Sequence, residues 1–98
     1  MEIVSTKNGS TLNIALTGRL DTTTAPQLEN HLWENLGDAE ELTLDFKALE
    51  YISSAGLRVL LSAQKIMNKQ GKMTIKNVCS DIMEVFDITG FSDILTIE

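Results

Sequence analysis

Several residue types are scarce in this chain of 98 residues, and each scarcity excludes a class of protein. The single cysteine, Cys79, cannot form a disulfide within the chain, which fits a reducing compartment. Eight Lys and Arg residues are scattered among fourteen Asp and Glu residues, so that the net charge is −6. Nucleic-acid binding requires clustered basic side chains that displace counterions. We therefore expect no nucleic-acid partner.

Long apolar runs and targeting signals are also missing. No apolar stretch approaches the roughly 18 residues that a membrane-spanning helix needs. The first residues, Met1 to Val4, lack the positive run and apolar core of a signal peptide. Together with the single cysteine, these features predict a cytoplasmic protein with no membrane partner.

Catalytic and metal-binding signatures are sparse as well. His31 is the only histidine and Cys79 has no patterned partner, so neither belongs to a group with metal-ligand spacing. The phosphate-binding loop Gly-x-x-x-x-Gly-Lys-Ser/Thr is absent, and Ser54 does not lie in a Gly-x-Ser-x-Gly elbow. We therefore expect a protein that is not an enzyme and holds no metal, with His31 in a structural position and Cys79 as a small buried residue.

The chain does contain enough apolar residues, 43%, for one core in a single domain over residues 1–98. Four segments carry the alternation or composition of strands with one buried face, and Asn8-Gly9 predicts a hairpin between the first two. A fifth, short apolar segment is predicted as a last strand. The five segments are Glu2–Thr6, Thr11–Thr17, 42–46, 73–76 and Ile94–Ile97.

Apolar stripes at helical spacing predict three helices between these strands. The first has Pro26 in its first turn and ends at Gly37; the second spans Ser54–Gln70; the third runs from Ser80 to Gly90. Passages from strand to strand through a helix imply parallel pairs. The sequence thus predicts an α/β fold with a mixed sheet of four or five strands and with helices packed mainly on one face.

The start of the second helix is the most informative segment. Serine is favoured at an N-cap because its hydroxyl accepts a hydrogen bond from a free backbone N–H, and this alone would explain Ser54. Gly56 costs about 1 kcal/mol relative to alanine inside a helix, which suggests a close approach to the backbone there. A helix N-terminus also stabilises an added phosphate. We predict Ser54 at the N-cap, exposed, as either a cap alone or a phosphorylation site.

Four segments, in this order and spacing, resemble the STAS domain of the bacterial anti-sigma-factor antagonist type. They are Leu16–Asp21, Leu44–Phe46, Tyr51–Leu61 and Ile88–Phe91. In that family the third segment usually reads Asp-Ser-Ser/Thr-Gly-Leu, and the serine after the aspartate is phosphorylated. That serine corresponds to Ser54 here, with Ser53 in place of the aspartate and as the alternative acceptor.

The resemblance also implies a set of partners. The unphosphorylated protein would bind an anti-sigma factor that is a serine kinase and so release a sigma factor. The kinase would then phosphorylate the serine with its own ATP, and a metal-dependent serine phosphatase would restore the binding form, so this chain needs no cofactor. The implied partner surface consists of Asp21, Thr22, Thr23, Ser53, Ser54, Ala55, Gly56 and Arg58.

Some alternatives stay open at this point. Asp21 fits turn or cap chemistry before the first helix as well as partner contact. A STAS module of another switch, controlling a transporter, a cyclase or a phosphatase, fits the same pattern, and so does a structural subunit of a larger assembly. The sequence does not separate a monomer from a weak dimer.

Overall fold

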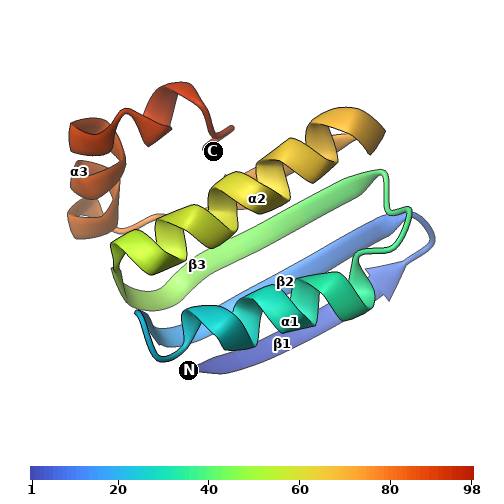
Figure 1. The fold of residues 1–98 in the computed structure, drawn as a ribbon, viewed down its shortest axis with the longest axis horizontal. Coiled ribbons are helices and arrows are strands. Elements are labelled where there is room, and N and C mark those ends of the chain that lie inside the picture. Colours follow the sequence, from blue (N-terminus) through green and yellow to red (C-terminus); the bar gives the residue numbers. More distant parts are fainter.

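A four-stranded mixed sheet lies at the centre of the computed structural model, which describes all 98 residues (Figure 1). The strands follow the order β1-β2-β3-β4, with β1 antiparallel to β2 and the other two neighbouring pairs parallel. The elements are β1 (Glu2–Asn8), β2 (Thr11–Leu20), α1 (Ala25–Asn35), β3 (Glu41–Ile52), α2 (Ser54–Gln70), β4 (Lys72–Lys76), α3 (Ser80–Thr89) and the 3-10 turn η1 (Phe91–Asp93). The predicted fold class is confirmed.

The predicted hairpin joins β1 and β2. Asn8 pairs with Thr11, so the turn itself consists of Gly9 and Ser10. Gly9 has a φ of +60°, a conformation that glycine adopts without the steric cost of a side chain. The strand alternation then sets which side chains point inward.

Helices α1 and α2 both cover one face of the sheet (Figure 1). The predicted stripe of α1 is buried against it, as are most apolar residues of α2. Leu44, at the middle of β3, is fully buried on this face, whereas Asn13 and Thr43 on the opposite face are only half-buried. Helix α3 closes one end of the core, where Phe86 packs against Phe46 with ring centroids 6.4 Å apart. One-sided burial is thus what the period-two pattern encodes.

The predicted fifth strand is wrong. Residues after α3 form η1 and turn back, with the N–H groups of Ile94 and Leu95 donating to the Phe91 carbonyl at 3.0 and 2.8 Å. Only Ile97 reaches β4, as an isolated bridge to Ile75. Of the apolar residues that suggested a strand, Leu95 is buried in the core, whereas Ile94 is exposed.

The second and third strands are longer than predicted. Strand β2 continues past Thr17 to Leu20 because two irregularities in its pairing with β3 absorb the change of register, one of them beside Gly18 with a φ of +100°. Strand β3 likewise continues to Ile52. This extension carries both strands to the edge where the predicted site lies.

Two structural expectations for single residues meet different outcomes. His31 is half-buried on α1, and its Nε2 lies 2.9 Å from the Ser5 hydroxyl, as expected for a structural histidine. Cys79 is exposed rather than buried, because it occupies the N-cap position of α3, outside the core.

No helix of the molecule has both the length and the apolar character needed to cross a membrane.

Candidate functional site

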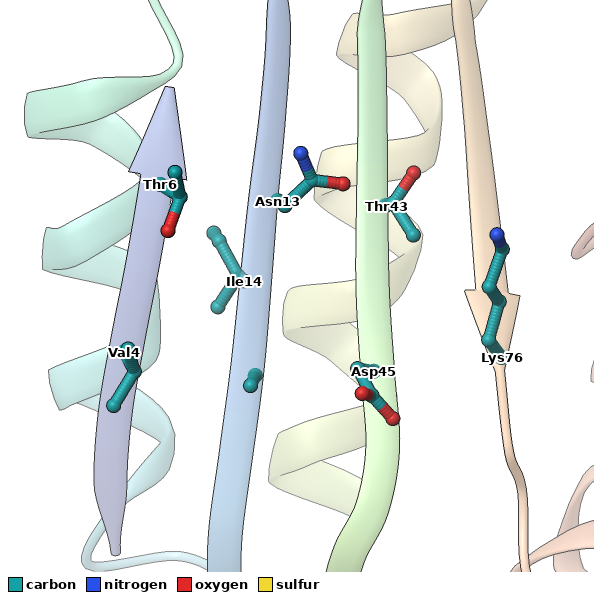
Figure 2. Close-up of a pocket in the computed structure, with 8 residues that line it drawn as sticks. Val4, Thr6, Asn13, Ile14, Thr43, Asp45 and Lys76 are labelled. Carbon is teal, nitrogen blue, oxygen red and sulfur yellow. The ribbon is translucent and has the colours of Figure 1, made fainter. Parts of the chain in front are cut away.

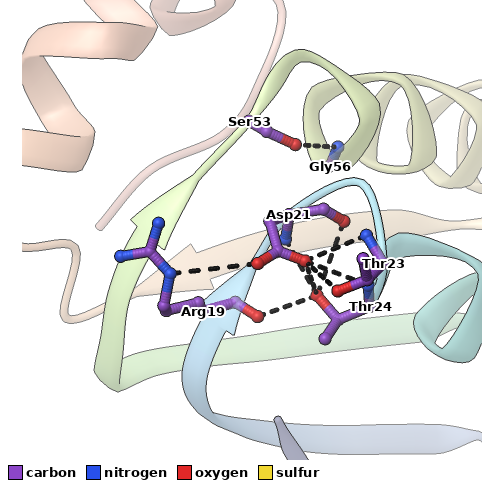
Figure 3. A network of polar contacts seen from close by, with 6 residues as sticks. All are labelled: Arg19, Asp21, Thr23, Thr24, Ser53 and Gly56. Atoms are coloured by element: carbon purple, nitrogen blue, oxygen red, sulfur yellow. Dashed lines mark hydrogen bonds and ion pairs between the residues drawn. The ribbon is translucent and has the colours of Figure 1, made fainter.

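The site lies where β2 and β3 end side by side. Leu20 pairs with Ile52, and the Ser53 N–H donates to the Leu20 carbonyl at 2.9 Å. Because the two strands are parallel, the residues that follow them leave the sheet at the same edge. Asp21 and Ser53, which are far apart in the sequence, therefore lie on adjoining segments (Figure 3). Ser54 follows Ser53 as the first residue of α2.

The N-cap of α2 lies one residue earlier than predicted. Ser53, with extended φ and ψ of −102° and 175°, is the N-cap of α2, and its Oγ accepts a 3.4 Å hydrogen bond from the Gly56 N–H. Ser54 is the first residue of the helix, not its cap. The prediction failed because β3 ends at Ile52 and leaves Ser53 to make the turn.

The Ser54 side chain is nevertheless placed as a modification site requires. The predicted exposure of Ser54 is confirmed, and its hydroxyl makes no hydrogen bond within the protein. A hydroxyl free of internal partners can be modified without first breaking a structural contact. The first turn of α2 also contains no acidic residue that would repel an added phosphate.

Asp21 organises the loop between β2 and α1. Its Oδ1 accepts hydrogen bonds from the Thr23 N–H at 3.0 Å, the Thr23 hydroxyl at 2.7 Å and the Thr24 N–H at 3.1 Å (Figure 3). The hydrogen bond from the Thr23 hydroxyl is the main reason why the pKa of Asp21 lies below its usual value. Turn chemistry at Asp21 is thus confirmed. Its other oxygen, Oδ2, forms an ion pair with Arg19, at 3.8 Å from Nε.

Gly56 is buried, and its neighbours explain why it is glycine. A Cβ at this position would lie 2.7 Å from Leu20 Cγ and 2.9 Å from Ile52 Cγ1. The close approach that the sequence suggested is therefore that of the protein's own core. Any contribution of Gly56 to a partner surface is indirect, through the position of α2 against the ends of β2 and β3.

A groove of about 230 Å³ runs beside the serines, between the first turns of α1 and α2. Three of the predicted partner-contact residues, Thr22, Ala55 and Arg58, line it. The sequence did not predict the other residues that line the groove, because packing of the two helices on the sheet determines which side chains of α1 face α2. These other residues are Ala25, Pro26, Glu29 and Val59.

Arg19 and Tyr51 form a second feature that sequence reasoning missed. The Arg19 guanidinium carbon lies 4.1 Å from the centroid of the Tyr51 ring, and both side chains are exposed at the site edge. Such cation–π stacking holds the two side chains in place. Only the irregular pairing of β2 with β3 brings them together, so no sequence motif signals the contact.

A separate hollow of about 300 Å³ lies on the sheet face opposite the helices (Figure 2). Asp45 there accepts hydrogen bonds from the Asn77 side chain and the Lys47 N–H, both at 2.9 Å, and the Asn77 bond is the main reason why the pKa of Asp45 lies below its usual value. Other side chains around it include Val4, Thr6, Asn13, Thr43 and Lys76.

Comparison with known proteins relates the whole chain to a family. The sequence profile of the STAS domain matches residues 2–98. Bordetella bronchiseptica BtrV, which carries the name of an anti-sigma factor antagonist, is 35% identical over 99 residues, covering 99% of this chain and 85% of BtrV. The anti-sigma-B factor antagonist of Bacillus subtilis is 29% identical over 92 residues, covering 93% of this chain and 84% of that protein.

A solved structure agrees with the fold. The Bacillus cell fate determinant SpoIIAA in its phosphorylated form superposes with a TM-score of 0.77 at 18% identity, covering 99% of this chain and 91% of SpoIIAA. At that identity the superposition concerns the fold: the same sheet and helices carry a sequence that differs at most positions.

Proposed function

Since the STAS domain profile matches residues 2–98, the chain belongs to the STAS domain family, and we propose that it is an anti-sigma factor antagonist controlled by phosphorylation of Ser54. One observation carries the proposal: Ser54 is exposed, has a free hydroxyl and opens α2 at the edge that Asp21 shares. The names of the relatives from Bordetella and Bacillus supply the functional class. The phosphorylated form in which SpoIIAA was solved supports control by phosphate.

The physical basis of the control is electrostatic. A phosphate on Ser54 adds about −1.5 to −2 charges at pH 7. It would stand beside the groove between α1 and α2, in the middle of the surface formed by Asp21, Ser53 and Arg58. Its position at a helix N-terminus leaves the fold intact, so the charge weakens partner binding without unfolding the domain.

The proposed partners follow from the family to which the chain belongs and from the names of its relatives. An anti-sigma factor with serine kinase activity binds the unphosphorylated protein, releases its sigma factor and later phosphorylates Ser54 with ATP. A metal-dependent serine phosphatase returns the protein to its binding form. The chain itself acts as a binding protein and not as an enzyme, and dependence on ATP places the cycle in the cytoplasm.

The phosphorylation site can be tested by intact-mass analysis after incubation with the cognate serine kinase and ATP. We expect one added phosphate on the wild type and on Ser53→Ala, and none on Ser54→Ala. Thermal unfolding of each variant serves as the control for folding. If Ser54→Ala gained a phosphate and Ser53→Ala did not, Ser53 would be the acceptor. In a separate binding experiment, if neither the phosphorylated nor the unphosphorylated protein released a sigma factor from its anti-sigma factor, the domain would belong to another regulatory switch.

A second prediction concerns affinity for the partner. Ser54→Asp places a permanent charge on the surface, and desolvating a charge for which the partner supplies no cation typically costs about 2–5 kcal/mol in binding. We expect its affinity to fall roughly 30-fold to several-thousand-fold, while Ser54→Ala binds like the wild type. Titration calorimetry measures both, with the phosphorylated protein alongside because aspartate carries less charge than phosphate. Equal affinities for the wild type, Ser54→Asp and the phosphorylated protein would contradict electrostatic control.

A further inference from the structure

The two arginines of the chain, Arg19 and Arg58, both lie at the site edge, but only one of them is engaged. Arg19 stacks on Tyr51 and forms the only ion pair of the molecule, with Asp21. Arg58 is exposed on α2, lines the groove and pairs with no carboxylate. The six lysines are unpaired as well, but Arg58 is the cation that lies within about one helical turn of the proposed phosphorylation site on α2.

The position of Arg58 relative to Ser54 on α2 suits it to bind an anion attached to Ser54. Arg58 follows Ser54 by four residues in α2, and side chains at that spacing lie next to each other on a helix surface, with Cβ atoms about 5–6 Å apart. An anionic group that precedes a cation by four residues is the favourable orientation of such a pair. Arginine also presents a planar fork of donors that matches phosphate oxygens.

We propose that Arg58 is the intramolecular binding site for the phosphate on Ser54, an inference that rests on the proposed function. In the unphosphorylated protein Arg58 is the cation of the groove, on the wall opposite Glu29. In the phosphorylated protein its guanidinium binds the phosphate and is no longer available to an acidic group of the partner. The groove then keeps the negative charge of Glu29 but no longer has a free positive charge. One modification thus changes the charge of the surface both at Ser54 and in the groove.

The test uses protein made with phosphoserine installed at position 54 during synthesis, followed by titration of the phosphate with ³¹P NMR. An adjacent cation stabilises the dianion, so we expect the second pKa of the phosphate to be about 0.2–0.4 unit higher in Arg58→Gln than in the wild type. Lys65→Gln removes one exposed cation from the same helix and is the matched control. Lys65 lies about 16 Å from position 54 along the helix axis, beyond the screening length, so its removal should leave the pKa of the phosphate unchanged.

A second readout reports on the arginine itself. The Arg58 Nε–H resonance should move downfield when Ser54 carries phosphate, and this shift should disappear below the phosphate pKa. Equal phosphate pKa values in the wild type, Arg58→Gln and Lys65→Gln, with an unchanged Arg58 resonance, would overturn the assignment. Because the phosphate is installed without a kinase, that result would leave the proposed function standing. Failure of any kinase to modify Ser54 would instead contradict the proposed function.

Discussion

At the scale of single residues, the neighbouring serines Ser53 and Ser54 divide two tasks between them. Ser53 uses its hydroxyl to cap α2, while Ser54 keeps its hydroxyl free at the surface. The sequence predicted a serine cap and an exposed serine but placed both at Ser54. Two identical side chains in a row carry no information about which one turns the chain, because that depends on where β3 ends.

This division predicts different effects on stability. Ser53→Ala removes the cap, at a cost of about 0.5–2 kcal/mol in the free energy of unfolding, and the long 3.4 Å bond to Gly56 favours the lower half of that range. Ser54→Ala removes no hydrogen bond and should stay within about 0.5 kcal/mol of the wild type. Urea unfolding of both variants measures the difference. A larger loss of unfolding free energy in Ser54→Ala than in Ser53→Ala would show that Ser54, not Ser53, caps α2.

At the scale of elements, the sequence predicted helices better than strands. The stripe of α1 and the full span of α2 are repeated over several turns, so each boundary is supported by many residues. The C-terminal strand rested on four residues, Ile94–Ile97, and so short an apolar segment fits several structures. Contacts with Phe91 and with β4, which no local pattern reveals, made it a turn with one bridge.

The junction of α2 with the sheet yields a prediction at this scale. In Gly56→Ala, the gain of about 1 kcal/mol in helix propensity competes with a Cβ pressed against Leu20 and Ile52. Overpacking of a core typically costs about 1–3 kcal/mol, so we expect a net loss of stability. Leu20→Ala should relieve the clash, and the double variant should lose less than the sum of the two single losses in chemical unfolding. A stabilised Gly56→Ala would contradict the packing explanation.

At the scale of the whole molecule, the one-sided arrangement of the helices was predictable, and the surface beside the serines was only partly so. Alternation in three strands defined a dry and a wet face, which the structure confirms. The family resemblance predicted Asp21, Thr22 and Arg58 as partner-contact residues, whereas Glu29 and Tyr51 were not predicted as site residues. The latter two reach the site edge through packing of α1 on the sheet and through the irregular pairing of β2 with β3.

Acid should destabilise the whole fold through two carboxyl groups. Hydrogen bonds lower the pKa of both Asp21 and Asp45 in the folded protein, so each stabilises the fold above the ordinary aspartate pKa of 3.8. This stability is lost as the pH falls through the lowered folded value. We expect Asp21→Asn with Asp45→Asn to flatten the dependence of unfolding free energy on pH between about 5 and 2. An unchanged slope would show that other acidic groups govern the response.

The parallel pairing of β2 with β3 has one more consequence, for when the site comes into existence. Asp21 and Ser54 are separated in the sequence by α1 and β3, and only the completed pair of strands brings them to one edge. A peptide of residues 49–60 contains the serines but neither Asp21 nor a helix packed on Leu20. An enzyme that recognises this edge would therefore pass over nascent or misfolded chains, and the modification would mark only molecules that have finished folding.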